Sequence, residues 1–219
     1  MGTGVWQGFA RAQVLPRLPG MALSGAVLHL PDTTWMLRGV AMVPARSQDS
    51  FWLWAFIQPL YVPADRLNFR YGQRLGRMSD RRLTGWPARF DRALGTEIAR
   101  SVRTQGLPGL AAVRDPGDLL SLVRAQDGAA TDLDHWEAAV YSAILAGDRA
   151  TVRLIGQQVR ELPENGAVGA VGAAEHRMRR VIAGYERDVG GTEIMLRRWR
   201  NATARALRLP RTTGTGPPG

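Results

Sequence analysis

The chain has 219 residues, of which 45% are hydrophobic and 22% charged, values typical of a folded globular protein rather than a disordered one. It contains no cysteine, which excludes disulfides, thiolate metal sites and cysteine nucleophiles. Its longest unbroken apolar run, residues 51–57, is much shorter than the roughly 20 residues that span a membrane. The N-terminus does not resemble a secretory signal. We therefore expect a soluble, cytoplasmic protein with no transmembrane segment.

The charge of the chain is strongly basic. All 29 basic residues are arginine, and against 19 acidic residues they give a formal net charge of +10. A GC-rich coding bias is the simplest reason for the absence of lysine, so the arginines by themselves are weak evidence for phosphate recognition. The net charge still attracts nucleic acid, anionic membrane surfaces or acidic proteins.

The charge is distributed unevenly along the chain. Residues 65–103 carry ten arginines against four acidic residues, and residues 177–211 carry ten against three. Between them, residues 115–137 hold six acidic residues and one arginine. Two interpretations stay open: the basic segments form a binding surface, or they are neutralised inside the molecule by the acidic stretch. We favour the second.

The first third of the chain predicts a small antiparallel sheet of three to four strands. Hydrophobic alternation and turn residues place these strands at residues 25–30, 35–43, 51–57 and 66–71. The third strand, FWLWAFI, is apolar on both faces and is predicted to be central and covered on both sides. The fourth alternates, with Arg66 and Arg70 on one side, and is predicted to be an edge strand with a basic outer face.

Helices are expected outside this sheet. A short helix is predicted at residues 9–18, where two prolines stop it early. After residue 79 the apolar period changes, and Pro87 is predicted to open a helix that ends at residues 106–109. Asp115, followed by proline, predicts the N-cap of the next helix.

The remaining helices have similarly clear boundaries. Residues 131–134 predict a helix start, and the pair Gly147 and Asp148 is predicted to close that helix and cap the following one, which ends before Pro163. Two last helices are expected at residues 175–189 and 192–209, with Gly190 and Gly191 between them.

Together these elements predict an α+β protein, with an antiparallel sheet followed by a bundle of about six helices. We expect an N-terminal sheet region at residues 1–78, a helical region packed on it at residues 79–209, and a disordered tail at residues 210–219.

Motifs for enzymatic chemistry are absent. Without lysine the chain has no P-loop, no Schiff-base residue and no kinase lysine, and it contains neither HExxH nor Gly-x-Ser-x-Gly. Its three histidines, His29, His135 and His176, lie far apart in sequence. We therefore expect no metal, no cofactor and no catalytic residues.

Seven tryptophans are present, and three of them, Trp35, Trp52 and Trp54, lie in the predicted sheet. Two interpretations are open. The tryptophans form an aromatic surface with Arg38 on one sheet face, or they form a core of large rings from which Arg38 reaches solvent. The apolar character of residues 51–57 favours the core.

The favoured function is a non-enzymatic protein-interaction module of the cytoplasm, of the immunity or operon-partner type, that binds a protein partner. A nucleic-acid-binding protein that uses residues 65–103 and 177–211 is the first alternative, and an enzyme with a dispersed acid/base site is the second. The candidate residues for binding a partner or an anion are Arg66, Arg70, Arg177, Arg179, Arg180, Arg197, Arg198 and Arg200.

Overall fold

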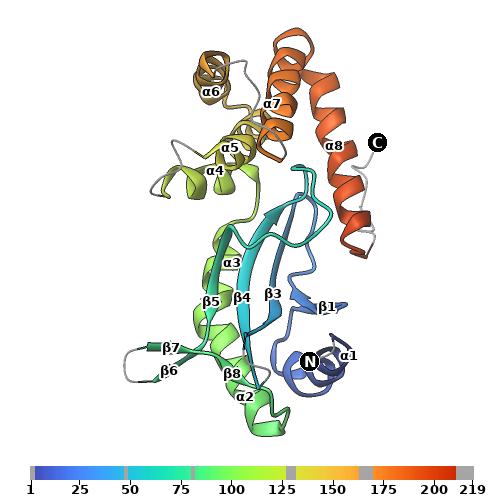
Figure 1. The fold of residues 1–219 in the computed structure, drawn as a ribbon. Coiled ribbons are helices and arrows are strands. Elements are labelled where there is room, and N and C mark those ends of the chain that lie inside the picture. Colours follow the sequence, from blue (N-terminus) through green and yellow to red (C-terminus); the bar gives the residue numbers. More distant parts are fainter. Residues whose placement is uncertain (1–2, 47–48, 80–81, 127–131, 163–169, 211–219) are drawn as a thin grey trace. The chain divides into compact units, whose positions relative to one another are not determined.

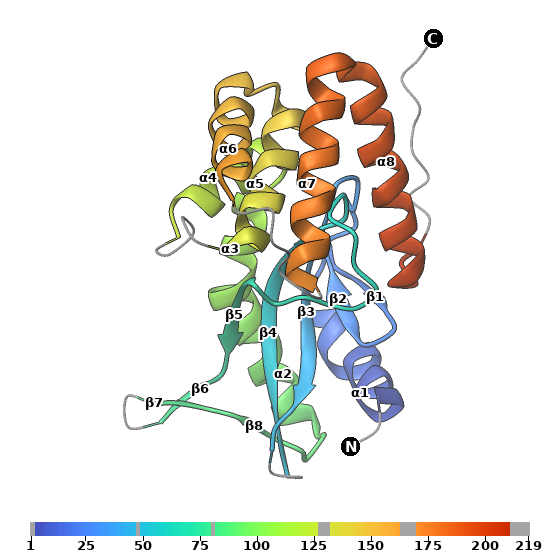
Figure 2. The same cartoon turned by 45° about the horizontal axis from the view of Figure 1, so that its top comes forward.

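A computed structural model describes residues 3–46, 49–79, 82–126, 132–162 and 170–210 (Figures 1 and 2). The predicted α+β class is confirmed: an antiparallel sheet near the N-terminus is followed by helices. In the described part of the chain the sheet has six strands, two or three more than predicted, and seven α-helices follow it. The predicted disordered tail lies outside the described residues, apart from Pro210.

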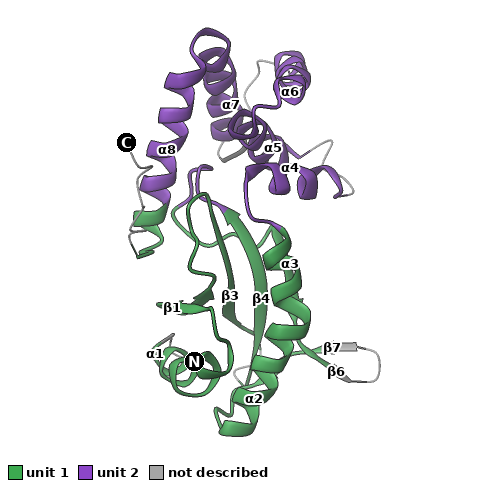
Figure 3. Ribbon diagram, turned by 180° about the vertical axis from the view of Figure 1, so that it is seen from behind, with its two compact units in different colours: residues 1–58, 65–112, 204–219 green, residues 59–64, 113–203 purple. Residues whose placement is uncertain are grey.

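The chain forms two compact units (Figure 3). Unit 1 holds residues 1–58, 65–112 and 204–219 and contains the sheet, whereas unit 2 holds residues 59–64 and 113–203 and is helical. No helix in the described ranges is both long enough and apolar enough to cross a membrane.

The sheet of unit 1 has the order β1-β2-β3-β4-β5, with β8 paired to the beginning of β4. The strands are β1 (Ala22–Ser24), β2 (Val27–His29), β3 (Met36–Pro44), β4 (Ser50–Pro59), β5 (Tyr71–Leu75) and β8 (Trp86–Pro87). A separate hairpin is formed by β6 (Arg77–Ser79) and β7 (Arg82–Thr84). The apolar run at residues 51–57 lies in β4, between β3 and β5, and its predicted central position is confirmed.

Helices cover one face of this sheet. They are α1 (Thr3–Phe9), its π-helical continuation η1 (Ala10–Val14), the short η2 (Leu15–Arg17), α2 (Arg92–Ser101), η3 (Val102–Gly106) and α3 (Leu107–Ala112). Figure 3 shows α2 and α3 lying along the strands. Rings of Trp6, Phe9 and Phe90 gather around Phe51 of β4, with centroids 4.8–6.0 Å apart. These contacts make an aromatic core on the helical side of the sheet.

The predicted strand at residues 66–71 is wrong for residues 66–70, which form a loop, and the edge strand β5 begins only at Tyr71. The amide of Gln58 fixes the loop: its Oε1 accepts from the backbone N–H of Asn68 (3.1 Å) and its Nε2 donates to the carbonyl of Arg66 (3.2 Å). The side chain of Asn68 in turn accepts from the N–H of Arg70 (2.8 Å). Side chains thus satisfy the backbone groups that a strand ladder would have used.

The helix expected from Pro87 begins later, because Pro87 pairs with Ser50 in β8. The helix starts at Arg92, where the carboxylate of Asp91 accepts from the N–H of Leu94 (2.8 Å). It also does not end at residues 106–109: the chain stays helical through η3 into α3. Gly106 lies close against Leu75 and Ala55 of the sheet, so glycine provides room for packing here rather than a break.

Unit 2 is built from α4 (Pro116–Arg124), α5 (Leu133–Ala146), α6 (Arg149–Glu161), α7 (Ala170–Arg187) and α8 (Val189–Ala206), the last three residues of α8 being assigned to unit 1. The predicted cap at Asp115 is confirmed by its bond from the N–H of Asp118 (2.9 Å). Gly147, with φ of +73°, closes α5, and Asp148 caps α6 as predicted. The helix α5 is buried along most of its length and packs against α4, α6 and α7.

The boundary between the last two helices differs from the prediction. Gly190 and Gly191 do not separate them but lie in the first turn of α8, and the break falls at Asp188. The carboxylate of Asp188 accepts from the N–H of Gly191 (2.9 Å), an N-cap bond. A Cβ at residue 191 would overlap this carboxylate, which explains glycine at that position.

Candidate functional site

Arg177, the first candidate of the C-terminal basic segment, takes part in a polar network inside unit 2. Its Nε and Nη2 donate to the two carboxylate oxygens of Glu137, at 2.7 and 2.8 Å. The hydroxyl of Tyr141 donates to the same carboxylate (2.9 Å). Burial, together with the neighbouring charge of Glu137, raises the pKa of Tyr141, and the hydrogen bonds with Glu137 raise the pKa of Arg177. Arg177 is therefore a structural partner of the acidic stretch.

Arg179 also has partners within unit 2. Its guanidinium pairs with Glu175 one turn earlier (2.9 Å) and donates to the carbonyl of Leu162 (3.2 Å). Arg177 and Arg179 are thus both engaged in charged contacts within unit 2.

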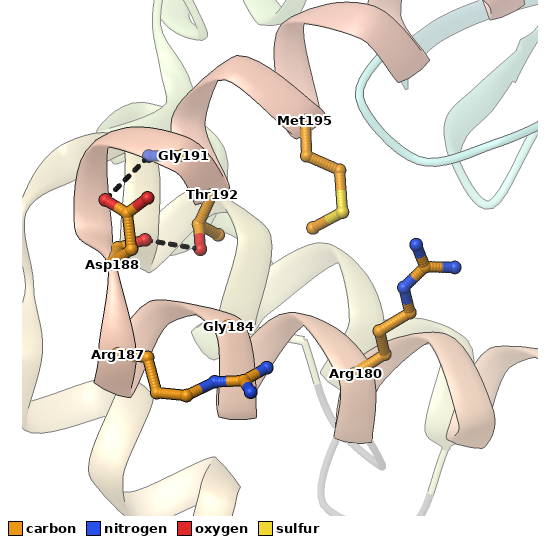
Figure 4. Close-up of a pocket in the computed structure, with 7 residues that line it drawn as sticks. All are labelled: Arg180, Gly184, Arg187, Asp188, Gly191, Thr192 and Met195. Atoms are coloured by element: carbon orange, nitrogen blue, oxygen red, sulfur yellow. Dashed lines mark hydrogen bonds between the residues drawn. The ribbon is translucent and has the colours of Figure 1, made fainter.

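Arg180 lines a groove between α7 and α8 (Figure 4). The groove encloses about 280 Å³, and Arg187, Asp188, Thr192 and Met195 are among the residues that line it. Asp188 is occupied as the cap of α8, and Thr192 donates to the carbonyl of Asp188 (2.9 Å). Two guanidinium groups and one carboxylate therefore line the groove, which leaves it with an excess positive charge.

The remaining C-terminal candidates lie further along α8. Arg198 is exposed, whereas Arg197 and Arg200 take part in further polar or ring interactions. The same helix exposes two large apolar side chains, Val189 (39%) and Ile194 (53%). Ile194 lies one turn before Arg198, so apolar and basic side chains share a face of α8.

The second face of β4, opposite the aromatic core, carries Trp52 and Trp54, both half-buried. Arg74 of β5 is opposite Trp54 in register, and its guanidinium carbon lies 5.0 Å from the ring centroid of Trp52 and 5.1 Å from that of Trp54. Phe69 packs against Trp54 from the loop before β5 (5.4 Å between centroids). We call these four residues, Trp52, Trp54, Phe69 and Arg74, the Trp–Arg surface.

The expectation that β4 is covered on both sides holds at Phe56, which lies on this second face and is fully buried, but not at Trp52 and Trp54, which are half-buried. The arginine involved is also a different one: Arg38 is buried and donates to the carbonyl of Asp32 (3.3 Å). Arg74 was missed because the fourth strand was placed too early in the chain. The sequence offers no signal for this contact, because it depends on the register between β4 and β5. Among the described residues Arg74 has no carboxylate partner.

The two units differ strongly in charge. Unit 1 contains 17 arginines and 6 acidic residues, a net charge of +11, whereas unit 2 contains 12 arginines and 13 acidic residues, a net charge of −1. The candidates Arg66 and Arg70 belong to unit 1, and the six C-terminal candidates belong to unit 2. Residues 65–103 thus lie in unit 1, whereas the C-terminal basic segment is divided: residues 177–203 belong to unit 2 and residues 204–211 to unit 1. The excess charge of the chain lies in unit 1, which carries the Trp–Arg surface.

Three features of the described ranges bear on metal or acid–base chemistry. No group of three or more His, Asp or Glu side chains there could hold a metal ion. His29 is held by Ser24 Oγ and the carbonyl of Leu30, both at 2.9 Å. Hydrogen bonds from Thr151 lower the pKa of the Asp148 carboxyl group to about 2. A general acid needs a raised pKa, so this shift has the opposite direction.

No family model, no curated protein and no solved structure matches the chain.

Proposed function

We propose that the chain is a non-enzymatic cytoplasmic binding protein whose sheet unit binds single-stranded nucleic acid. The observation that carries the proposal is the stacking of Arg74 on Trp52 and Trp54, in a unit of net charge +11. Aromatic side chains beside basic ones are the combination that single-stranded nucleic acids require: rings for the bases and cations for the phosphates.

The geometry of the stack suits phosphate binding. A guanidinium that lies over an aromatic ring uses its flat face, and the N–H groups at its edge stay available for an oxyanion. Arg74 is exposed, and the rings of Trp52 and Trp54 hold it in place, so less side-chain entropy is lost when a phosphate binds.

Single strands are favoured over duplexes for a physical reason. Half-buried tryptophans on a sheet can stack only on bases that are already unstacked, and such stacking does not depend on sequence. The basic charge of unit 1 adds an attraction to phosphates that salt weakens.

Fluorescence titration with a short oligothymidylate tests the proposal. We expect the oligonucleotide to quench tryptophan emission and to bind more tightly than a duplex of equal length. Trp54→Ala should weaken binding by about 1–3 kcal/mol, the value of one base stacked on an aromatic ring. Arg92→Gln is the matched control for Arg74→Gln, since Arg92 is an exposed arginine of the same unit on the helical side. Equal losses in these two arginine variants would exclude the Trp–Arg surface as the site.

An acidic protein partner is the second candidate, favoured by the groove between α7 and α8. Arg180 and Arg187 provide its charge, and α8 also exposes the apolar side chain of Ile194, which adjoins the lining residue Met195 in sequence. Interfaces that combine arginine with apolar anchors at their centre are typical of protein recognition.

A photocrosslinking amino acid at position 194 tests this candidate in cells. We expect a discrete crosslinked product that disappears when Arg180 and Arg187 are both changed to Glu. Position 154 is the control, because Leu154 is equally exposed (59%) on α6. Products of the same size from both positions, insensitive to the arginine changes, would contradict the candidate.

A further inference from the structure

We infer that a cavity at the C-terminal end of α2 binds a small ligand that carries an oxyanion, either a carboxylate or a phosphate group. The cavity has a volume of about 420 Å³ and lies within unit 1. This volume is within the range of about 300–1,000 Å³ that is usual for small-molecule sites. The polar side chains that line it belong to Arg77, Glu97, Arg100, Ser101, Thr104 and Gln105.

The side chains that line the cavity carry a net charge of +1, which one anionic group would balance. Nε of Arg77 donates to Oε1 of Glu97 (2.8 Å), so the charges of these two side chains cancel each other. Arg100 is exposed and has no carboxylate partner among the described residues. Two guanidinium groups against one carboxylate give an excess of one positive charge, which a single carboxylate or phosphate group would match.

A second observation comes from Ser101. It is 5% exposed, and its Oγ is buried and has no hydrogen-bond partner. Other hydroxyls on the same helical stretch bond to the carbonyl four residues earlier, Thr96 to Arg92 (3.1 Å) and Thr104 to Arg100 (3.0 Å). Ser101 makes no such bond.

A buried hydroxyl without a protein partner costs free energy, which a ligand oxygen or a water molecule recovers by completing the hydrogen bond. Ser101 is the last residue of α2, directly before the π-helical turn η3, and such turns are frequent at functional sites. We therefore assign the Ser101 hydroxyl and the Arg100 guanidinium as the groups that hold the oxyanion.

This inference is independent of nucleic-acid binding. The cavity is lined by α2, η3, Trp86 and the segment after β5. The C-terminal end of η3 packs on Ala55 of β4, whose side chain is on the opposite face of the strand from those of Trp52 and Trp54. Loss of one binding activity should therefore leave the other unchanged.

Thermal unfolding of the full chain tests the inference, because a ligand that binds only the folded state raises the melting temperature. Phosphate and acetate are the probes, each compared with chloride at equal ionic strength. We expect at least one of them to raise the melting temperature. A response to phosphate alone identifies a phosphorylated ligand, and a response to acetate alone identifies a carboxylate. No response to either probe would overturn the inference.

Two variants test whether the rise in melting temperature comes from an anion bound at Arg100 and Ser101. Arg100→Gln should weaken the response by about tenfold in affinity, the value of a charged hydrogen bond. Ser101→Ala should also weaken it, without lowering the melting temperature in chloride, because it removes a hydroxyl that has no partner. Arg92→Gln, on the same helix but away from the cavity, is the control and should respond like the wild type. A full response in both Arg100→Gln and Ser101→Ala would place the anion elsewhere and refute the assignment.

Discussion

The guanidinium of Arg177 binds both carboxylate oxygens of Glu137, and the carboxylate is almost completely buried, with 1% of the residue exposed. This pair joins the basic C-terminal segment to the acidic stretch at residues 115–137. It also joins α7 to α5, the buried helix of unit 2. Internal neutralisation therefore accounts for part of the C-terminal basic charge, and the net positive charge of the molecule resides in unit 1.

Removing one partner of this pair should be costly. Glu137→Ala leaves the Arg177 guanidinium and the Tyr141 hydroxyl without their acceptor, and we expect unfolding in urea to show a loss of about 3–5 kcal/mol. The exposed pair of Arg160 and Glu186, 3.3 Å apart, is the control: Glu186→Ala should cost less than about 1 kcal/mol. Similar losses in the two variants would mean that Glu137 is not a buried charge.

The cap of α6 should make stability depend on pH in acid. Bonds from the hydroxyl (2.7 Å) and the N–H (3.1 Å) of Thr151 lower the pKa of Asp148 from 3.8 to about 2 in the folded protein. Because the folded pKa lies below the unfolded one, the stabilisation is complete above the unfolded value and is lost as pH falls toward 2.

Asp148→Asn should keep the cap but remove this part of the pH dependence. The measurement is the free energy of unfolding as a function of pH for both proteins. Parallel curves through this pH range would show that Asp148 does not titrate with folding.

The helix boundaries were predicted best where a side chain or a glycine acts locally. Asp115, Gly147 and Asp148 each satisfy a helix end through neighbours within a few residues, so the sequence alone reveals them. The segment at residues 66–71 was misjudged because its conformation depends on Gln58, eight to ten residues away. Alternation of side chains cannot report such a contact.

The two glycines at the start of α8 should respond differently to alanine. Gly190→Ala places a methyl group at ordinary contact distance from Asp188 (3.6 Å) and should stabilise the helix by up to about 1 kcal/mol. Gly191→Ala drives a methyl group into the capping carboxylate and should cost about 1 kcal/mol through loss of the cap. Thermal unfolding compares them, and equal melting temperatures would show that Asp188 does not cap α8.

Tryptophans of the sheet unit should differ in their contribution to stability. Trp86 is 1% exposed and its Nε1 donates to the carbonyl of Leu75 (2.8 Å), so Trp86→Ala should cost about 3–5 kcal/mol. Trp54 is half-buried, and Trp54→Ala should cost clearly less in the same urea titration. A larger loss for Trp54→Ala would mean that its ring belongs to the core and not to a binding surface.

The candidate site was predicted only in part. The sequence identified tryptophan in the central strand and a basic segment after it, both of which follow from composition. It could not identify Arg74 as the partner of Trp52 and Trp54, because this depends on the register between β4 and β5. It could not reveal the cavity beside Ser101 either, because its walls come from α2, η3 and the segment after β5.

The salt dependence of oligothymidylate binding tests the central claim most directly. If phosphates bind the Trp–Arg surface, the logarithm of the association constant should fall linearly with the logarithm of salt concentration, by about 0.7 for each phosphate contacted. Arg74→Gln should reduce that slope by about 0.7, whereas Arg198→Gln in unit 2 should leave it unchanged. Absence of binding at low salt, or equal slopes for Arg74→Gln and the wild type, would contradict the claim that this surface binds nucleic acid.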